Sequence, residues 1–544
     1  MSLTFAWGQS IIPEHNKVVN YTQILFQTTP VDFASIYEFQ FDSIDGDFSK
    51  PIFQKIDSTH VTIVNGFEFG GSYKWKVNAY DQHQNLLGAS DIFNFKIRKS
   101  STVDDANFRF RVIKSEKDFN ENEVIFLDYS RVAINRKGEP VWFMPALDED
   151  IRNSRIRDMK MTGFGTITYL TPKSCREVTI DNQLVWQTPS HNVSSNDSVA
   201  DVYHHEFTKT SRNTYLVLSK EFVDKTLTNG DQTINQVPIT VVKEYDQNGE
   251  VIWYWSSLNY ITDNDLLEVG KKVFLGNTFG HANSVSESKD GKKVYVGFRD
   301  LNSILCVNKE SNKLIFSYGD KIPSDTTKNG VGFFKKQHAA IPYSKGKILV
   351  FNNNIRGSTS SVIIFSEAND ESESQIIWEF PCDFDTLMPG NSDRMGNAEH
   401  LKSDGILVNM GSVARLFEVN PEKKVTWDCL PEQWNQDSLE WRPYSNYRLN
   451  HQSSLYPKYA SISLKKDIND ENYISICNEG TDSDDYKLII KSKKGKILDT
   501  VLFDLNHNQS YRYYLSKKII SKGHSFEVIS ESTGKTYELN FSAL

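Results

Sequence analysis

A repeat in the middle of the chain limits the possible folds more than any other feature. Six segments share one form: a turn that often contains Gly or Asn, then two apolar residues, then an aromatic residue. The aromatic residues lie 44, 67, 63, 62 and 49 residues apart, which leaves room for one four-stranded blade per segment. Even spacing with one aromatic per unit is typical of a β-propeller, and six units predict six blades. A stack of two-sheet sandwiches is the alternative. The aromatic residues are Trp142, Trp186, Trp253, Phe316, Trp378 and Trp427.

The repeat is flanked by segments of a different kind. Near the N-terminus, Tyr73, Trp75, Val77 and Ala79 alternate with polar residues, as in the last strands of a fibronectin III-like β-sandwich. After about residue 455 the repeat stops, and strand-like alternation continues between hairpin turns such as SKG and STGK. Long stretches of helical period are missing from the sequence. We therefore predict an all-β protein with the following domains: an N-terminal β-sandwich at 1–98, a six-bladed β-propeller at 105–452 and a small C-terminal β-domain at 455–544.

A second strand recurs inside the repeat units and begins with a polar residue. Four such strands align at nearly one register, eight residues before a turn Asn or Gly in three units and ten in the fourth. The innermost strand of each propeller blade lines the central channel, so residues at one register point into one axial pocket. The four leading residues are His205, His281, His338 and Asn397.

Two further residues are expected to join this pocket. Asn283 lies two residues after His281, and period two places both on one face of the strand. Arg299 ends the next strand, and a hairpin at Gly291 returns it to His281. Imidazoles, an amide and a guanidinium suit a tetrahedral oxyanion, and a neutral imidazole can attack its central atom. The chain has no phosphate-binding loop, dinucleotide fingerprint or acidic cluster for Mg²⁺, so no cofactor is expected.

At these residues the chain resembles the bacterial arylsulfotransferases, also called aryl-sulfate sulfotransferases. The likeness covers roughly 105–452 and, more loosely, the N-terminal sandwich. The matching pieces are YHHEF at 203–207, GHANSVS at 280–286 with FRDLNS at 298–303, KQHAAI at 336–341 with FNNNIRGSTSSVIIF at 351–365, and GNAEHL at 396–401 with GSVARLFEV at 411–419.

The resemblance implies an enzyme that moves a sulfuryl group from a phenolic sulfate ester to another phenol, without an adenylyl-sulfate donor. It also implies a sulfohistidine intermediate on His338 and ping-pong kinetics. The expected partners are small phenolic sulfates and phenols. The family turn D-N-G is replaced here by Asn352-Asn353-Asn354.

The resemblance and the strand register together give the candidate site residues. The family's His-His pair falls on 204 and 205, and the register favours the second of these for the pocket while leaving the first open. The predicted catalytic residues are His338, His281, Arg299 and His205. The predicted substrate-binding residues are Asn283, His204, Arg356 and Asn397.

Charge and cysteine content exclude several other classes. The net charge is −9 and basic residues are scattered, so neither nucleic acid nor an anionic membrane is an expected partner. Five widely spaced cysteines without a CxxC pair argue against a zinc or disulfide framework, and predict reduced thiols. No signal peptide is apparent, so we expect a cytoplasmic location, although the well-studied members of the resembled family are periplasmic. The oligomeric state is left open, with a homodimer as one option.

Two other functions are compatible with parts of the pattern. Three His around one axis suit Zn²⁺ or Mn²⁺ in a metal-dependent lyase or hydrolase, but Arg299 would repel a cation and no carboxylate at the register completes the set. A propeller between two β-domains also suits a non-catalytic interaction module. We therefore expect no bound metal.

Overall fold

We describe the protein from a computed structural model. The structure describes residues 11–99, 107–116, 118–145, 156–189, 203–268, 278–320, 328–344, 346–354, 358–369, 371–515 and 524–540. Strands dominate these residues, and helices are few and short: η1 (Ser257–Asn259), α3 (Asp263–Glu268), η3 (Phe279–His281) and η4 (Gly411–Val413).

The middle of the chain forms sheets that we number 1 to 6 in chain order; their strands pair antiparallel, except that β25 pairs in parallel with β24 in sheet 4. Sheet 1 contains β10 (Val124–Leu127), β11 (Val132–Ile134), β12 (Pro140–Phe143) and the late strand β35 (Leu449–Gln452). Sheet 2 contains β13 (Arg157–Met161), β14 (Ile167–Leu170), β15 (Cys175–Val178) and β16 (Leu184–Gln187). Sheet 3 contains β17 (Tyr203–Lys209), β18 (Tyr215–Asn229), β19 (Gln232–Tyr245) and β20 (Val251–Ser256).

Sheets 4 to 6 repeat the same order of strands. Sheet 4 contains β21 (Ala282–Glu287), β22 (Lys293–Phe298), β23 (Ser303–Asn308), β24 (Leu314–Gly319) and β25 (Lys328–Asn329). Sheet 5 contains β26 (His338–Ser344), β27 (Lys347–Asn352), β28 (Ser361–Ser366) and β29 (Ile376–Pro381). Sheet 6 contains β30 (Asn397–His400), β31 (Ile406–Asn409), β32 (Leu416–Val419), β33 (Val425–Asn435) and β34 (Glu440–Pro443), and β9 (Phe108–Ser115) pairs with β33.

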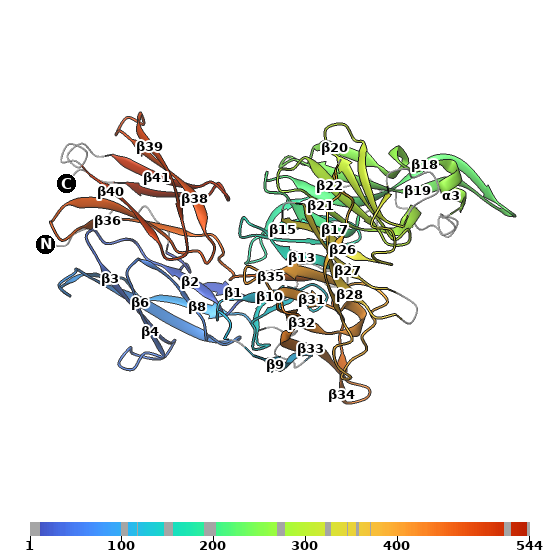
Figure 1. Cartoon of the computed structure of the whole chain (residues 1–544). Coiled ribbons are helices and arrows are strands. Elements are labelled where there is room, and N and C mark those ends of the chain that lie inside the picture. Colours follow the sequence, from blue (N-terminus) through green and yellow to red (C-terminus); the bar gives the residue numbers. More distant parts are fainter. Residues whose placement is uncertain are drawn as a thin grey trace.

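One edge strand from each of these sheets contacts its neighbours in a closed cycle: β13, β17, β21, β26, β30, β35 and back to β13. Figure 1 shows many of these strands together in the right half of the molecule. Apolar clusters fill the space between neighbouring sheets, for example Leu216, Val242, Val285 and Val296 between sheets 3 and 4. Because β35 joins sheet 1 from the far end of the repeat, the ring is closed by strand pairing between distant segments. The structure thus confirms the predicted all-β class and the β-propeller.

Four of the repeated aromatic residues are tryptophans that join their sheet to the next one. Each lies on the fourth strand counted from the inside of the ring, and its indole N–H donates to a carbonyl in a turn of the following sheet. Burying the ring while pairing its one polar atom removes the cost of an unsatisfied donor. The bonds run from Trp142 to Ile180 (2.8 Å), Trp253 to Lys309 (2.8 Å), Trp378 to Pro421 (3.3 Å) and Trp427 to Arg136 (2.7 Å).

The N-terminal strands form two sheets over an aromatic core that includes Phe26, Trp75 and Phe95. One sheet has the order β1-β8-β6-β3-β4 with β7 on β6, and the other pairs β2 with β5. Their bounds are β1 (Lys17–Val19), β2 (Ile24–Gln27), β3 (Ile36–Ser43), β4 (Phe53–Asp57), β5 (Val61–Val64), β6 (Ser72–Tyr80), β7 (Leu86–Ala89) and β8 (Phe93–Ile97).

The C-terminal strands form two more sheets, β36-β37-β40 and β39-β38-β41-β42. They lie beside the N-terminal sheets (Figure 1), and Tyr459 Oη donates to Gln27 Oε1 at 2.7 Å. The predicted domain limits at 98, 105, 452 and 455 stay predictions. The strand bounds are β36 (Ala460–Lys466), β37 (Asn472–Asn478), β38 (Asp484–Lys491), β39 (Ile497–Leu505), β40 (Ser510–Tyr514), β41 (Ser525–Ser530) and β42 (Thr536–Asn540).

In the part of the chain that the structure describes, no helix has the length and apolar character needed to cross a membrane.

Candidate functional site

A cavity of about 670 Å³ lies where the first strands of sheets 3, 4 and 5 begin. Its lining includes His205, His281, Arg299 and His338, the four residues predicted as catalytic. They come from three different sheets and are separated by up to 133 positions in the sequence. The structure therefore brings together all four of these residues.

Local backbone geometry turns these side chains into the cavity. His205 and His281 have positive φ values of 66° and 53°, and Ala339, next to His338, has 52°. In each case the pairing of the first strand with the second shifts register at this place, which marks a β-bulge. A bulge re-aims a side chain, and left-handed backbone at a non-glycine residue costs about 1–3 kcal/mol. The hairpin in sheet 4 behaves as the sequence predicts, since Arg299 N donates to His281 O at 3.1 Å.

The ring of His338 is held in one tautomer. Its Nδ1 lies 2.6 Å from Asn353 Oδ1 and 3.2 Å from the carbonyl of Lys336. The amide nitrogen of Asn353 is occupied by the carbonyls of Ser392 (3.1 Å) and Met395 (3.0 Å), so its oxygen faces the ring. Since both partners of Nδ1 are acceptors, Nδ1 carries the proton and Nε2 carries the free lone pair.

The same ring is kept neutral. Burial lowers the pKa of His338 well below its ordinary value of 6.5, and the guanidinium charges of Arg448 and Arg299 lower it further. The bond to Asn353 acts in the opposite direction. Arg448 is buried and donates to Gly396 O and, at 3.1 Å, to Asn283 O. A buried cation of this kind disfavours a second positive charge nearby.

Three imidazoles form a hydrogen-bonded chain beside His338. His281 Nε2 lies 3.2 Å from His205 Nε2, and His205 Nδ1 lies 2.8 Å from His204 Nδ1. Burial lowers the pKa of His204 to about 3 and that of His205 well below 6.5, with the neighbouring imidazoles lowering both further. His205 lines the cavity and His204 lies behind it, so the pair acts as an inner and an outer member of one chain.

The remaining predicted residues lie elsewhere. Asn283 is fully buried outside the lining and donates to Gln337 O at 2.7 Å. Asn397 also lies outside the lining, and its amide exchanges two hydrogen bonds with the backbone of Leu449, at 2.9 and 3.0 Å. Arg356 lies outside the described residues. In these positions Asn283 and Asn397 join neighbouring sheets and do not reach the cavity.

Sequence reasoning missed Arg157, Tyr447 and Arg448. Arg157 and Tyr447 line the cavity, and Arg448 is buried outside the lining, where its charge lowers the pKa of His338. Arg157 is the first residue of β13, and Tyr447 and Arg448 directly precede β35; the register comparison included neither strand. Aligning β13 and β35 with the other inner strands would have identified these three residues.

The cavity is strongly cationic. Arg131, Arg157, Arg299 and Arg394 contribute to its described lining, which contains no Asp or Glu. Arg299 pairs with Asp300 at 2.8 Å, just outside the lining. Tyrosine rings supply the other walls. Guanidinium groups beside aromatic surface suit a sulfated aromatic molecule. Within the described residues, no group of three or more His, Cys, Asp or Glu side chains is arranged to hold a metal ion.

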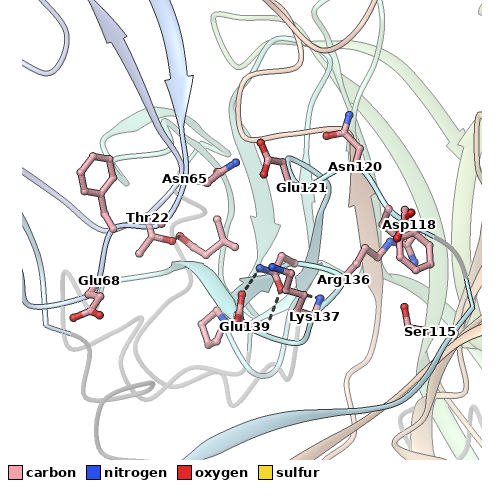
Figure 2. Close-up of a pocket in the computed structure, with 16 residues that line it drawn as sticks. Thr22, Asn65, Glu68, Ser115, Asp118, Asn120, Glu121, Arg136, Lys137 and Glu139 are labelled. Carbon is pink, nitrogen blue, oxygen red and sulfur yellow. Dashed lines mark hydrogen bonds between the residues drawn. The ribbon is translucent and has the colours of Figure 1, made fainter. Parts of the chain in front are cut away.

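A second cavity, of about 660 Å³, lies between the N-terminal strands and sheet 1 (Figure 2). Glu68 and Asn65 line one side, and Arg136 and Glu139 the other. Arg136 is already paired with Glu123 at 2.9 Å. None of the predicted site residues lies here, so the axial cavity is the candidate active site.

Fold and site together define a β-propeller with an arginine- and histidine-lined axial pocket. A family model described as Arylsulfotransferase (ASST) matches residues 153–432, which is more than half of the chain. The chain belongs to the arylsulfotransferase family, as its motifs predicted, and this membership supports an aryl sulfotransferase activity in general.

Comparison with other proteins adds only distant similarities. No protein among the curated sequences matches this chain. A Bacteroides caccae protein of unknown function has 14% identity and a TM-score of 0.36, covering 63% of this chain and 98% of that one. A streptogramin B lyase has 11% identity and a TM-score of 0.33, and the match covers 68% of this chain and 94% of that one. Hydrazine synthase from Kuenenia stuttgartiensis has 10% identity and a TM-score of 0.28, and the match covers 71% of this chain and 95% of that one.

Proposed function

We propose that this protein is an aryl-sulfate sulfotransferase that moves a sulfuryl group from a phenolic sulfate to another phenol through a sulfohistidine on His338. The observation that carries the proposal is the state of this ring. It is neutral, it has its lone pair on Nε2, and it lies in a cavity with Arg299 and two further imidazoles. These are the properties that a nitrogen nucleophile toward an anionic ester requires.

In the first half-reaction, Nε2 of His338 attacks sulfur. The N–S bond forms as the S–O bond to the aryl group breaks, and the electron pair leaves with the phenolate. The ring then carries positive charge, which is shared with Nδ1–H. The bond from Nδ1–H to Asn353 Oδ1 strengthens as this charge develops, so Asn353 stabilises the intermediate as well as the tautomer.

In the second half-reaction, the acceptor phenol attacks sulfur. The N–S bond breaks and its electron pair returns to Nε2. The phenol proton passes to an imidazole of the chain formed by His281, His205 and His204. That imidazole gives the same proton to the leaving phenolate of the next donor, so protons balance over a cycle. Neither half-reaction needs a nucleotide or a metal ion.

Charge on the three sulfuryl oxygens is stabilised by groups that are already in place. Arg299 is held by Asp300 and by the carbonyl of Asp393, at 2.8 and 3.3 Å, so its guanidinium is oriented before substrate binds. Preorganised donors of this kind cost little reorganisation during the reaction, and loss of one typically lowers the rate by about 10²–10³-fold. We therefore expect a rate loss of that size in Arg299→Gln.

The covalent half-reaction gives the decisive test. Wild-type protein is mixed with 4-nitrophenyl sulfate, quenched rapidly and digested. We expect a gain of about 80 Da, the mass of SO₃, on the peptide that contains His338, together with a burst of nitrophenol. His338→Ala should lose both, and His83→Ala, at an exposed turn, should keep both. Nitrophenol release by wild type without the adduct would contradict the mechanism.

Transfer itself is measured in the same system. With phenol as acceptor and no adenylyl-sulfate present, initial rates at several donor and acceptor concentrations should give the parallel double-reciprocal lines of ping-pong kinetics. Intersecting lines would indicate a single ternary complex and direct transfer.

A further inference from the structure

The part of the axial cavity that lies opposite His338 has no role in the mechanism above. Arg131, in the turn between β10 and β11, and Arg157, the first residue of β13, line it. In the ring of inner strands, sheet 1 lies opposite sheet 4 and sheet 2 lies opposite sheet 5. Arg131 and Arg157 therefore face Arg299 and His338 from across the cavity.

The charges on this side are held in a partly desolvated place. Burial lowers the pKa of Arg131, and the hydroxyls of Tyr444 and Tyr169 act in the other direction. The charge of Arg157 reaches into the cavity. Burial and the neighbouring imidazoles lower the pKa of His205, and Arg157 lowers it further; burial raises the pKa of Tyr447, and Arg157 acts against that rise. A desolvated guanidinium binds an anion strongly, and preferably through two hydrogen bonds.

Aromatic surface connects the two sides. Tyr447 lies between them, with its ring centroid 6.4 Å from that of His338 and 6.2 Å from that of Tyr129. Tyr129 stands in the same turn as Arg131. A cavity of about 670 Å³ is in the upper half of the usual range for small-molecule sites, about 300–1,000 Å³, so it accommodates more than a phenyl ring with one sulfate.

We propose that the natural substrates are aromatic compounds with two anionic groups: the phenolic sulfate, at Arg299 and His338, and a carboxylate on the same aromatic system, at Arg131 and Arg157. This inference rests on the proposed function. Because donor and acceptor occupy the same place in turn, the acceptor is a phenol with a carboxylate as well. Tyr129 and Tyr447 provide the aromatic contact between the two anion sites.

The test compares two donors that differ only in this charge. One is 3-carboxy-4-nitrophenyl sulfate and the other is its carboxamide, and the readout is kcat/KM for nitrophenol release. Wild type should prefer the carboxylate by about 10- to 100-fold, as expected for a charge-assisted pair. Arg131→Gln and Arg157→Gln should each lower this ratio by about tenfold, and Arg131→Lys, which keeps the charge, should lower it less. Arg442→Gln, at an exposed arginine outside the cavity, is the control and should keep the ratio.

The outcomes separate this inference from the proposed function. Turnover of 4-nitrophenyl sulfate with a carboxylate-to-carboxamide ratio near one in wild type would overturn the inference alone. No turnover of any of the three donors would overturn the proposed function and the inference with it. A preference that survives in both Gln variants and vanishes in about 0.5 M salt would indicate general electrostatic steering, and would also overturn it. Circular dichroism checks the fold of each variant, and Arg131→Lys gives the answer if a Gln variant does not fold.

Discussion

At the scale of single residues, the chemistry depends on which nitrogen of His338 carries the proton. Asn353 decides this, because its amide nitrogen is fixed by two carbonyls and only its oxygen faces the ring. We expect Asn353→Ala to lower kcat by about 10–100-fold, the usual cost of losing a group that orients a reactive side chain. Because Asn353 does not line the cavity, KM should change little. Steady-state kinetics, measured below the melting temperature of the variant, gives kcat and KM separately. A rise in KM at constant kcat would contradict this role.

The pH dependence follows from the same ring. An ordinary histidine with a pKa of 6.5 loses nucleophilicity as pH falls through that value. Because burial, Arg448 and Arg299 lower the pKa of His338, we expect kcat/KM to keep its value through pH 6.5 and to fall only in more acidic solution. Asn353→Asp places a carboxylate on Nδ1, which stabilises the imidazolium, so its acid limb should move to higher pH. An unchanged acid limb in that variant would mean that another group titrates.

From the sequence, the meeting of residues in the cavity could be predicted where the pattern within a single strand or hairpin determines the position of each side chain. His205, His281 and His338 share a register, and Arg299 follows a hairpin back to one of them, so periodicity sufficed to bring them together. Asn353 and Arg448 act through contacts between strands whose packing no single segment determines. Asn283 shares a strand face with His281 in an ideal pleat, but the bulge between Ala282 and Ser284 breaks that alternation.

At the scale of elements, the side chain of Asn397 joins two inner strands of the ring, β30 and β35, that do not pair with each other. Asn397 leads β30 at the same register as the histidines, yet its amide bonds both the N–H and the C=O of Leu449 at the start of β35. The same register position thus supplies reactive groups in sheets 3 to 5 and a clamp in sheet 6. Since β35 is the strand that closes the ring, Asn397 connects the last inner strand of the repeat to the first sheet.

This clamp gives a prediction that distinguishes stability from catalysis. Asn397→Ala leaves two buried backbone groups of Leu449 without partners, at a cost of about 1–3 kcal/mol each. We expect a melting temperature lower by several degrees, with kcat/KM at low temperature within about threefold of wild type. Differential scanning calorimetry and initial rates are compared with the exposed Asn469→Ala as control. A large loss of kcat/KM with an unchanged melting temperature would indicate that Asn397 binds substrate and does not act as a structural clamp.

At the scale of the whole molecule, the ring and the flanking sheets meet at a small polar cavity of about 310 Å³. Its lining comes from three parts of the chain: Asp57 from the N-terminal sheets, Glu121 from the segment before β10, and Glu479 with His507 from the C-terminal sheets. The sequence indicated separate flanking segments, because their patterns differ from the repeat. The sequence could not predict how these segments pack against the ring and against each other, because contacts between two surfaces leave no periodic pattern in the sequence of either surface.

Glu479 makes this junction sensitive to pH. It is buried, and burial together with the charge of Asp57 raises its pKa from 4.5 to about 7. Between these two values the folded chain holds a proton that the unfolded chain has lost. The stability from this group is therefore present in acid and lost as pH rises from 4.5 toward 7. Above pH 7 the loss amounts to about 3 kcal/mol, since one pKa unit corresponds to about 1.4 kcal/mol.

Replacing Glu479 with Gln keeps an acceptor for Ser461 and removes the ionisation. We expect Glu479→Gln to raise the melting temperature by several degrees at pH 8, where the wild-type carboxylate is charged and buried, and to change it little near pH 5. Melting curves at both pH values test this, with Glu471→Gln at an exposed turn as the matched control. An equal shift at both pH values would mean that Gln acts through packing, because only ionisation of Glu479 makes the difference depend on pH.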